Sequence, residues 1–298
     1  MTDPKRWTIG NIRLTPIVEA ETTGIPVEFF FPTANGADVA RADWLTPGSA
    51  DGSTIAFRVQ SFVLERLDEH GRRDPDAGLV VVDPCVGNHK QRNLAFWNML
   101  DTSWFDDFEA AGFAAADVTI VVHTHLHEDH IGWDTHLVDG VWQPTFTNAR
   151  HVYVGDELDF AERDDRRVGH DPFADSIKPV LDAGLGWEVD STAEIAPGIR
   201  LVPSPGHTPG HVSMIIDTGA EPLAITGDAL HHQFQFTNPS IAEVADIDIP
   251  LAQRSRSELF SDWASSGAVV AGTHFAIEPV GVVSAHDGAW RFDPVSAD

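Results

Sequence analysis

The segment from residue 123 to residue 130 reads His-Thr-His-Leu-His-Glu-Asp-His, and no other part of the chain constrains the fold as strongly. It directly follows Val118–Val122, an apolar, β-branched run with the length and composition of a buried strand. Imidazole nitrogens and carboxylate oxygens are the ligands that zinc and similar divalent ions prefer. An accidental polar turn is the alternative, but it leaves so dense a cluster of histidines unexplained. We therefore predict a strand that ends in a metal-binding loop.

The loop carries candidate ligands with the spacing His-x-His-x-Asp-His, and three later segments are built in a similar way. The candidates in the loop are His125, His127, Asp129 and His130. In each later segment a short apolar run precedes one candidate ligand: Ile199–Val202 before His207, Leu223–Ile225 before Asp228, and Ala268–Ala271 before His274. Strand ends that converge on one edge would bring these side chains together. Seven ligands exceed the needs of one tetrahedral ion and fit two ions that share a carboxylate.

With these residues in this order, the chain resembles the metallo-β-lactamase superfamily over nearly everything from Val80 to His274. The resemblance implies two divalent metal ions bridged by Asp228 and otherwise held by two sets of ligands: His125, His127 and His207 for one, and Asp129, His130 and His274 for the other. Asp83 matches an aspartate that usually supports the site in this family. The implied fold is α/β, a four-layer αββα metallo-β-lactamase sandwich with the metals at one edge between the two sheets.

The rest of the pattern agrees with α/β layering, although periodicity alone does not give that architecture. We expect strands at Ile12–Glu21 and Thr54–Leu64, and a hairpin within Val280–Phe292 around Asp287-Gly288. We expect helices at Lys90–Leu100, Asp106–Gly112, Asp156–Arg167, Pro172–Ala183 and Leu251–Ser265. No clean linker is visible, so residues 1–298 are predicted to form a single domain with an N-terminal loop-rich extension at 24–53.

The loop-rich segment 24–53 contains three consecutive phenylalanines, Phe29 to Phe31, which cannot all face one core. They pack against their own domain, form a subunit contact, or line a hydrophobic wall of the substrate pocket. We take Phe29 and Phe30 as candidate pocket residues, together with Trp133 and Phe275 near the ligand motifs. For Trp133, ordinary packing is an equal alternative.

Composition restricts the partners and the location of the chain. The formal net charge is −27, with three lysines, which disfavours the phosphate backbone of nucleic acids and anionic membranes. No apolar stretch approaches the ~20 residues that span a bilayer. No apolar segment follows the basic Lys5 and Arg6, so we expect no signal peptide. Cys85 is the single cysteine, which excludes an internal disulfide and fits a cytoplasmic protein. A homodimer is left open.

The implied ligand set predicts hydrolysis. Two divalent ions lower the pKa of a shared water, so that a metal-bridging hydroxide becomes the nucleophile, and they stabilise the oxyanion that forms. Asp129 and Asp228 are ligands first, and either could also relay a proton to the leaving group. Zinc is the expected metal, while manganese, iron and cobalt accept the same ligands.

The bond that is cleaved is less constrained. The segments around His130, Asp228 and His274 resemble the branch of lactonases and methyl-parathion-hydrolase-like esterases. Acyl-homoserine lactonases of that branch typically carry a tyrosine three positions after the bridging aspartate, where this chain has His231. His231 either donates a hydrogen bond to the developing oxyanion or is structural. His211 resembles a residue that orients a neighbouring ligand, and His123 is interpreted as support rather than as a ligand.

The leading hypothesis is therefore a dinuclear hydrolase that opens a lactone or cleaves a carboxylic ester and takes a small-molecule substrate. A phosphotriesterase is the nearest alternative. Thioester hydrolysis, β-lactamase action and a mono-iron persulfide dioxygenase rank lower, as does a flavodiiron protein, which typically has a glutamate where His127 stands. A binding-only protein ranks last, because such proteins tend to lose ligands.

Overall fold

The computed structural model describes residues 4–164 and 169–298. The chain divides into two compact units. The first contains Met1–Ala20 and Val59–Asp190, and the second contains Glu21–Arg58 and Ser191–Asp298. The single-domain organisation stays a prediction.

The first unit is built on a mixed sheet, whose strands run in the order β1-β2-β4-β5-β6-β9-β10. The strands are β1 (Trp7–Ile9), β2 (Ile12–Pro26), β4 (Thr54–Arg66), β5 (Leu79–Val82), β6 (Val118–Val122), β9 (Arg150–Val154) and β10 (Gly186–Val189). Strand β6 lies between β5 and β9 and is parallel to both, which explains why its sequence is a short apolar run. A separate hairpin joins β7 (Thr135–Val138) to β8 (Val141–Pro144).

Helices of the first unit largely follow the predicted positions. They are α3 (Trp104–Ala110), α4 (Gly155–Arg163), and a π-helical turn at Phe173–Ile177 that continues into α5 (Lys178–Asp182). Of the helix predicted at Asp156–Arg167, residues 165–167 lie outside the described part of the chain. Apolar side chains from the π-helical turn and α5 pack against Tyr153 of β9 and against Leu126 and Ile131 of the ligand loop. The loop therefore rests on a small hydrophobic core.

The helix predicted at Lys90–Leu100 is wrong, because the structure has only turns there. The segment closes on itself: the Met99 amide donates to the Lys90 carbonyl at 2.8 Å, and the Asn98 side chain accepts from the Arg92 amide at 3.0 Å. Met99 has a positive φ of 56°, which is incompatible with a continuous helix. These local hydrogen bonds form in place of the backbone hydrogen bonds of an α-helix.

The second unit is built on a sheet in the order β11-β12-β13-β14-β15-β16-β17. The strands are β11 (Glu194–Ala196), β12 (Ile199–Pro203), β13 (Val212–Ile216), β14 (Leu223–Ile225), β15 (Val269–Ala271), β16 (Val280–His286) and β17 (Ala289–Pro294). The predicted C-terminal hairpin is confirmed as β16 and β17, which turn at Asp287-Gly288. Strands β14 and β15 are parallel neighbours, so their carboxyl ends lie at the same edge.

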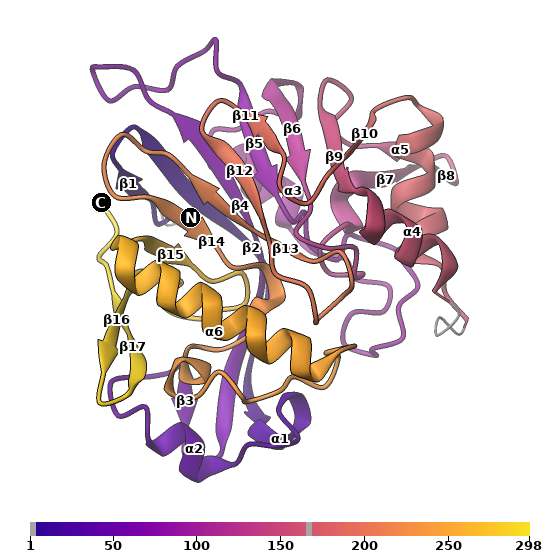
Figure 1. Ribbon diagram of the computed structural model, residues 1–298. Coiled ribbons are helices and arrows are strands. Elements are labelled where there is room, and N and C mark those ends of the chain that lie inside the picture. Colours follow the sequence, from indigo (N-terminus) through magenta and orange to yellow (C-terminus); the bar gives the residue numbers. More distant parts are fainter. Residues whose placement is uncertain (1–3, 165–168) are drawn as a thin grey trace. The chain divides into compact units, whose positions relative to one another are not determined.

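Helix α6 (Ile249–Ser266) covers one face of this sheet (Figure 1). It begins where the Asp248 side chain accepts a hydrogen bond from the Leu251 amide at 3.0 Å, and it ends at Gly267, whose φ of 67° suits a left-handed cap. Leu259, Phe260 and Trp263 share one face and pack in a hydrophobic core of this unit. This packing fixes the connection that follows β14.

The segment 24–53 contains two short helices and a short strand: α1 (Val27–Phe30), α2 (Gly36–Ala40) and β3 (Ala50–Asp51). Turns and irregular chain make up the remainder. Phe30 and Phe31 are buried, whereas Phe29 is 49% exposed, in agreement with the expectation that the three rings cannot share one core.

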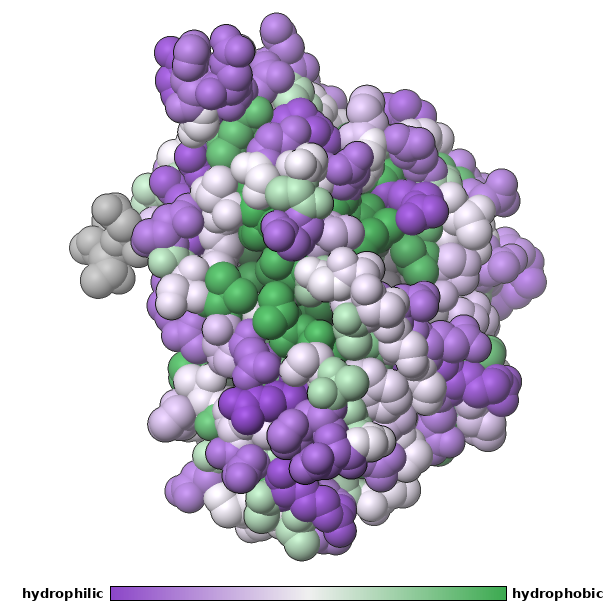
Figure 2. Space-filling model, turned by 60° about the vertical axis from the view of Figure 1, so that its left-hand side comes forward, coloured by the Kyte–Doolittle hydropathy of each residue, from purple (hydrophilic) through white to green (hydrophobic). Residues whose placement is uncertain are grey.

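The surface reflects the acidic composition of the chain. Figure 2 shows one face of the molecule, on which hydrophilic side chains are abundant. Among the helices that the structure describes, none combines the length and apolar character needed to cross a bilayer.

Candidate metal centre

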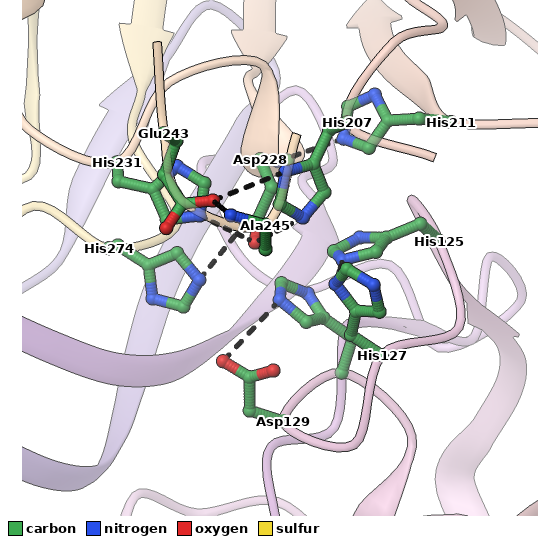
Figure 3. Close-up of polar contacts among 12 residues, drawn as sticks. His125, His127, Asp129, His207, His211, Asp228, His231, Glu243, Ala245 and His274 are labelled. Atoms are coloured by element: carbon green, nitrogen blue, oxygen red, sulfur yellow. Dashed lines mark hydrogen bonds and ion pairs between the residues drawn. The ribbon is translucent and has the colours of Figure 1, made fainter. Parts of the chain in front are cut away.

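In the first unit, the ligand loop begins directly after β6, and its histidines lie close together. The Nε2 atom of His125 is 2.9 Å from Nδ1 of His127, and the rings of His125 and His130 have centroids 4.1 Å apart. Asp129 is 3.7 Å from the His130 ring through its Oδ2 atom (Figure 3). His125 and His130 are buried and His127 is half-buried. The predicted loop thus gathers its four candidate ligands in one place.

Asp83 fixes the start of this loop. Its carboxylate accepts hydrogen bonds from both the amide and the hydroxyl of Thr124, each at 2.8 Å, and its Oδ2 atom is 3.1 Å from Nδ1 of His130. Asp83 has a φ of 50°, a conformation that a residue with a side chain rarely adopts and that costs free energy. The strained residue orients an imidazole, which agrees with the supporting role that the family resemblance implies.

The loop ends at Asp134, which is fully buried. Its carboxylate contacts His123, His151 and the hydroxyl of Tyr153. Burial by itself raises the pKa of the Asp134 carboxyl, but His123 and His151 outweigh burial and hold that pKa well below its ordinary value. No sequence motif connects these residues, which come from two separate segments of the chain.

In the second unit, Asp228 lies in a turn just after β14 and faces a set of imidazoles. Its Oδ1 atom is 3.0 Å from Nε2 of His274, and its Oδ2 atom is 3.0 Å from Nε2 of His231 and 3.5 Å from Nε2 of His207 (Figure 3). Asp228, His231 and His274 offer ligand atoms that lie within 4.8 Å of one another. The three predicted strand-end ligands of this unit therefore meet, as expected.

Each of these side chains is oriented by a neighbour. The Asp228 amide donates to Nε2 of His211 at 2.8 Å, so His211 holds the turn that carries the carboxylate. Nδ1 of His274 donates to the Arg58 carbonyl at 2.7 Å. Metal-binding histidines usually donate their second N–H in this way, which leaves Nε2 available for the ion.

A second set of buried charges lies behind His207. The Asp246 carboxylate is 3.3 Å from Nδ1 of His207 and accepts from the Arg256 guanidinium at 3.1 Å. Glu243 approaches the same imidazole at 3.8 Å and accepts from the Ala245 amide at 2.6 Å (Figure 3). Burial raises the pKa of the Glu243 carboxyl to about 7. Sequence analysis missed Glu243, Asp246 and Arg256, because no motif connects them to His207.

The donor chemistry of both units fits divalent metal ions. Within each unit, imidazole nitrogens and carboxylate oxygens converge, and backbone carbonyls or carboxylates occupy the far side of His130, His207 and His274. Borderline divalent ions prefer such nitrogen and oxygen ligands, and such outer partners fix the ring orientation. In the first unit the ligands would be the four loop residues, and in the second unit His207, Asp228 and His274.

His231 and His232 have different surroundings. His232 Nε2 donates to the Ser49 carbonyl at 2.9 Å, and burial lowers the pKa of this imidazole to about 4, consistent with a structural role. His231 contacts Asp228 through Nε2, while its buried Nδ1 has no hydrogen-bond partner among the described residues. His231 is therefore placed on the carboxylate of the candidate ligand Asp228, and it lacks the outer hydrogen bond that Nδ1 of His274 makes.

The four candidate pocket residues have different positions within their units. Trp133 is buried, stacks on Trp104 at 5.1 Å and donates its indole N–H to Glu19 at 2.7 Å. Phe275 is buried in the same hydrophobic core of the second unit as Leu259, Phe260 and Trp263. The structure thus places both side chains in packed interiors.

Phe29 and Phe30 instead belong to a row of aromatic rings that reaches a ligand. Phe29 contacts Phe30, Phe30 stacks on Phe57 at 4.7 Å, and Phe57 stacks on His274 at 4.3 Å. Phe57 was missed, because it lies within a strand whose apolar residues all look alike in sequence.

Comparison with known proteins agrees with this geometry. Residues 72–274 match the family model of the metallo-beta-lactamase superfamily, so the chain belongs to this superfamily. An N-acyl homoserine lactonase from a Bacillus species is 27% identical over 43% of this chain and 44% of that protein. The probable metallo-hydrolase Rv2300c of Mycobacterium tuberculosis is 30% identical over 68% of this chain and 66% of that protein. The matched parts are thus less than two thirds of the length of either relative.

A solved structure confirms the fold. That structure is AidC, described as a dizinc quorum-quenching lactonase in complex with a product; it matches 99% of this chain and 98% of that chain. The TM-score is 0.76 at 20% sequence identity. The mixed α/β sheets and helices of the chain are therefore those of the metallo-beta-lactamase fold.

Proposed function

We propose that the protein is a dinuclear metal-dependent hydrolase that opens a lactone or cleaves a carboxylic ester. The observation that carries this proposal is the Asp228 carboxylate, which presents its two oxygens to different imidazoles, Oδ1 to His274 and Oδ2 to His207. A carboxylate that faces imidazoles on two sides in this way is suited to be shared by two ions. Membership of the superfamily and the lactonases among the relatives support the same conclusion.

The ligands would divide as the family pattern implies. One ion would take His125, His127 and His207, the other would take Asp129, His130 and His274, and Asp228 would bridge. Two bound divalent ions polarise the carbonyl of a substrate and lower the pKa of water. The chain itself supplies the orientation of the ligands through Asp83, Asp246 and the Arg58 carbonyl.

His231 is the protein group that we assign to the reaction besides the ligands. Its Nε2 atom is 3.0 Å from the Asp228 carboxylate, and it stands where the related lactonases typically carry a tyrosine. A protonated Nε2 would donate a hydrogen bond to an oxyanion that forms beside Asp228. Either Asp129 or Asp228 would relay the proton that the leaving group takes up.

We further propose zinc as the metal, on the basis of the nitrogen-rich ligand set and of AidC, which is described as a dizinc enzyme. The aromatic row Phe29–Phe30–Phe57 in the second unit runs from the exposed Phe29 through two buried rings to His274. We propose that an acyl group of the substrate packs against the exposed end of this row. Cytoplasmic location and a homodimer stay predictions.

Initial hydrolysis rates on one matched panel test the substrate class. The panel contains acyl-homoserine lactones, simple γ-lactones, aryl esters and a phosphotriester, measured with zinc-loaded protein and with Asp228→Ala as the blank. We expect the highest kcat/KM on lactones or aryl esters. A preference for the phosphotriester would instead establish the alternative function, and no turnover on any of them would contradict the proposal.

A further inference from the structure

The two ends of the ligand loop meet in the interior of the first unit. His123 is the residue directly after β6, and Asp134 closes the turn at Gly132–Asp134 that follows the last ligand. Nε2 of His123 forms an ion-pair contact with Oδ2 of Asp134 at 2.9 Å. His125, His127, Asp129 and His130 all lie in the chain between these two residues.

Both ends are also tied to strand β9. The Nδ1 atom of His123 donates to the Val152 carbonyl at 2.9 Å. The Nδ1 atom of His151 is 3.1 Å from Oδ1 of Asp134, and the Tyr153 hydroxyl donates to Oδ2 of Asp134 at 3.1 Å. All of the residues that make these side-chain contacts are at most 2% exposed: His123, Asp134, His151 and Tyr153. In such a dry environment, charged hydrogen bonds are strong and an unpaired partner is costly.

His123, Asp134 and His151 also have the chemistry of a metal site, since their ligand atoms lie within 4.8 Å of one another. Charge balance favours a hydrogen-bonded arrangement instead. A divalent ion with two neutral imidazoles and one carboxylate would leave a net positive charge in the interior, whereas an imidazolium and a carboxylate cancel.

We propose that Asp134 is a positioning residue for the metal centre. With His123, His151 and Tyr153 it forms a buried clasp that closes the base of the ligand loop and keeps the four loop ligands in place. The clasp acts through the loop backbone and contacts neither substrate nor metal. Its effect on metal affinity rests on the proposed function, whereas its effect on the loop does not.

Asp134→Asn tests the clasp in the full chain, because it keeps the shape of the side chain but removes the charge. We expect the amides of residues 124–133 to exchange hydrogen at least about tenfold faster, with unchanged exchange in the second unit. Chelator competition should show zinc affinity reduced about 10- to 100-fold, the range for lost outer partners. The cobalt-loaded variant should show absorption bands that differ from those of the cobalt-loaded wild type, because these bands report ligand geometry.

Two further variants keep the test decisive. Leu14→Ala removes a buried side chain on β2, which β4 and β5 separate from β6 in the sheet, and it should lower stability without changing cobalt absorption or zinc affinity. Tyr153→Phe removes one hydrogen-bond donor and keeps the Asp134 carboxylate, so it should change loop exchange, zinc affinity and cobalt absorption in the same direction but less. This variant still tests the clasp if Asp134→Asn does not fold.

Three outcomes would contradict either the clasp or the proposed function on which its effect on metal affinity rests. Unchanged loop exchange and cobalt absorption in both clasp variants would overturn it. A third metal ion per wild-type chain, lost in Asp134→Asn, would replace the clasp with a metal site. A wild type that binds no metal would defeat the proposed function, while hydrogen exchange of the metal-free proteins would still decide on the clasp.

Discussion

The two units present their candidate ligands in different ways. The first unit places four ligands within six residues of one loop, whereas the second collects His207, Asp228 and His274 from the ends of separate strands. In the first unit the loop is held at its base by Asp83 and the clasp. In the second unit each ligand has its own support. Damage should therefore affect the loop ligands together and the strand-end ligands separately.

The largest effect is expected for Asp228→Ala, which removes the proposed bridge. Hydrolysis should fall by more than about 100-fold, beyond the effect of losing an outer partner, and bound metal should decrease. Metal analysis and kcat/KM measure both. The exposed Asp262→Ala is the matched control and should behave as wild type. Full activity with two bound ions in Asp228→Ala would refute the site.

Asp246→Asn and Asp83→Asn compare the supports of the two units directly. In the family pattern, His207 and His130 bind different ions. Each variant should therefore lower the affinity for one ion about 10- to 100-fold and leave the affinity for the other nearly unchanged. Stepwise removal with a chelator would show one early and one late ion in each variant. Simultaneous loss of both ions in each case would show that the supports are not independent.

His231→Phe separates a reacting group from a ligand. We expect kcat to fall about 100-fold, the lower range for the loss of one donor to an oxyanion, with metal content unchanged. His286→Phe, an exposed histidine on β16, serves as the control. An unaltered rate would make His231 structural, and a loss of metal would make it a ligand.

A further prediction concerns the pH dependence of stability in the first unit alone. Lys90 is buried beside Thr135 and Asp175, and burial lowers the pKa of its amine from 10.5 to about 8. Between these values the unfolded chain binds the proton and the folded chain does not, so the free energy of unfolding should rise with pH. Relative to Lys90→Met, wild type should gain up to about 3 kcal/mol from pH 8 to 10.5 in urea unfolding. If the difference in free energy of unfolding between the two proteins does not change with pH, the lowered pKa of Lys90 is contradicted.

The same comparison explains what could be predicted from the sequence. Strand β6 and the loop that follows it were predicted correctly because the signal is local, and the convergence of His207, Asp228 and His274 followed because short apolar runs precede them. The role of these residues as metal ligands stays a prediction. The helix at Lys90–Leu100 was wrong because side-chain and backbone bonds within that segment override helical propensity. Asp134, Asp246 and Phe57 could not be found, since each contacts its partner only after distant segments have folded together.

The number of metal ions per purified chain, measured together with lactone hydrolysis before and after chelation, tests the central claim most directly. The account predicts two divalent ions per chain, loss of hydrolysis when they are removed, and recovery when zinc is restored. A single redox-active iron per chain, or full hydrolysis by metal-free protein, would contradict it.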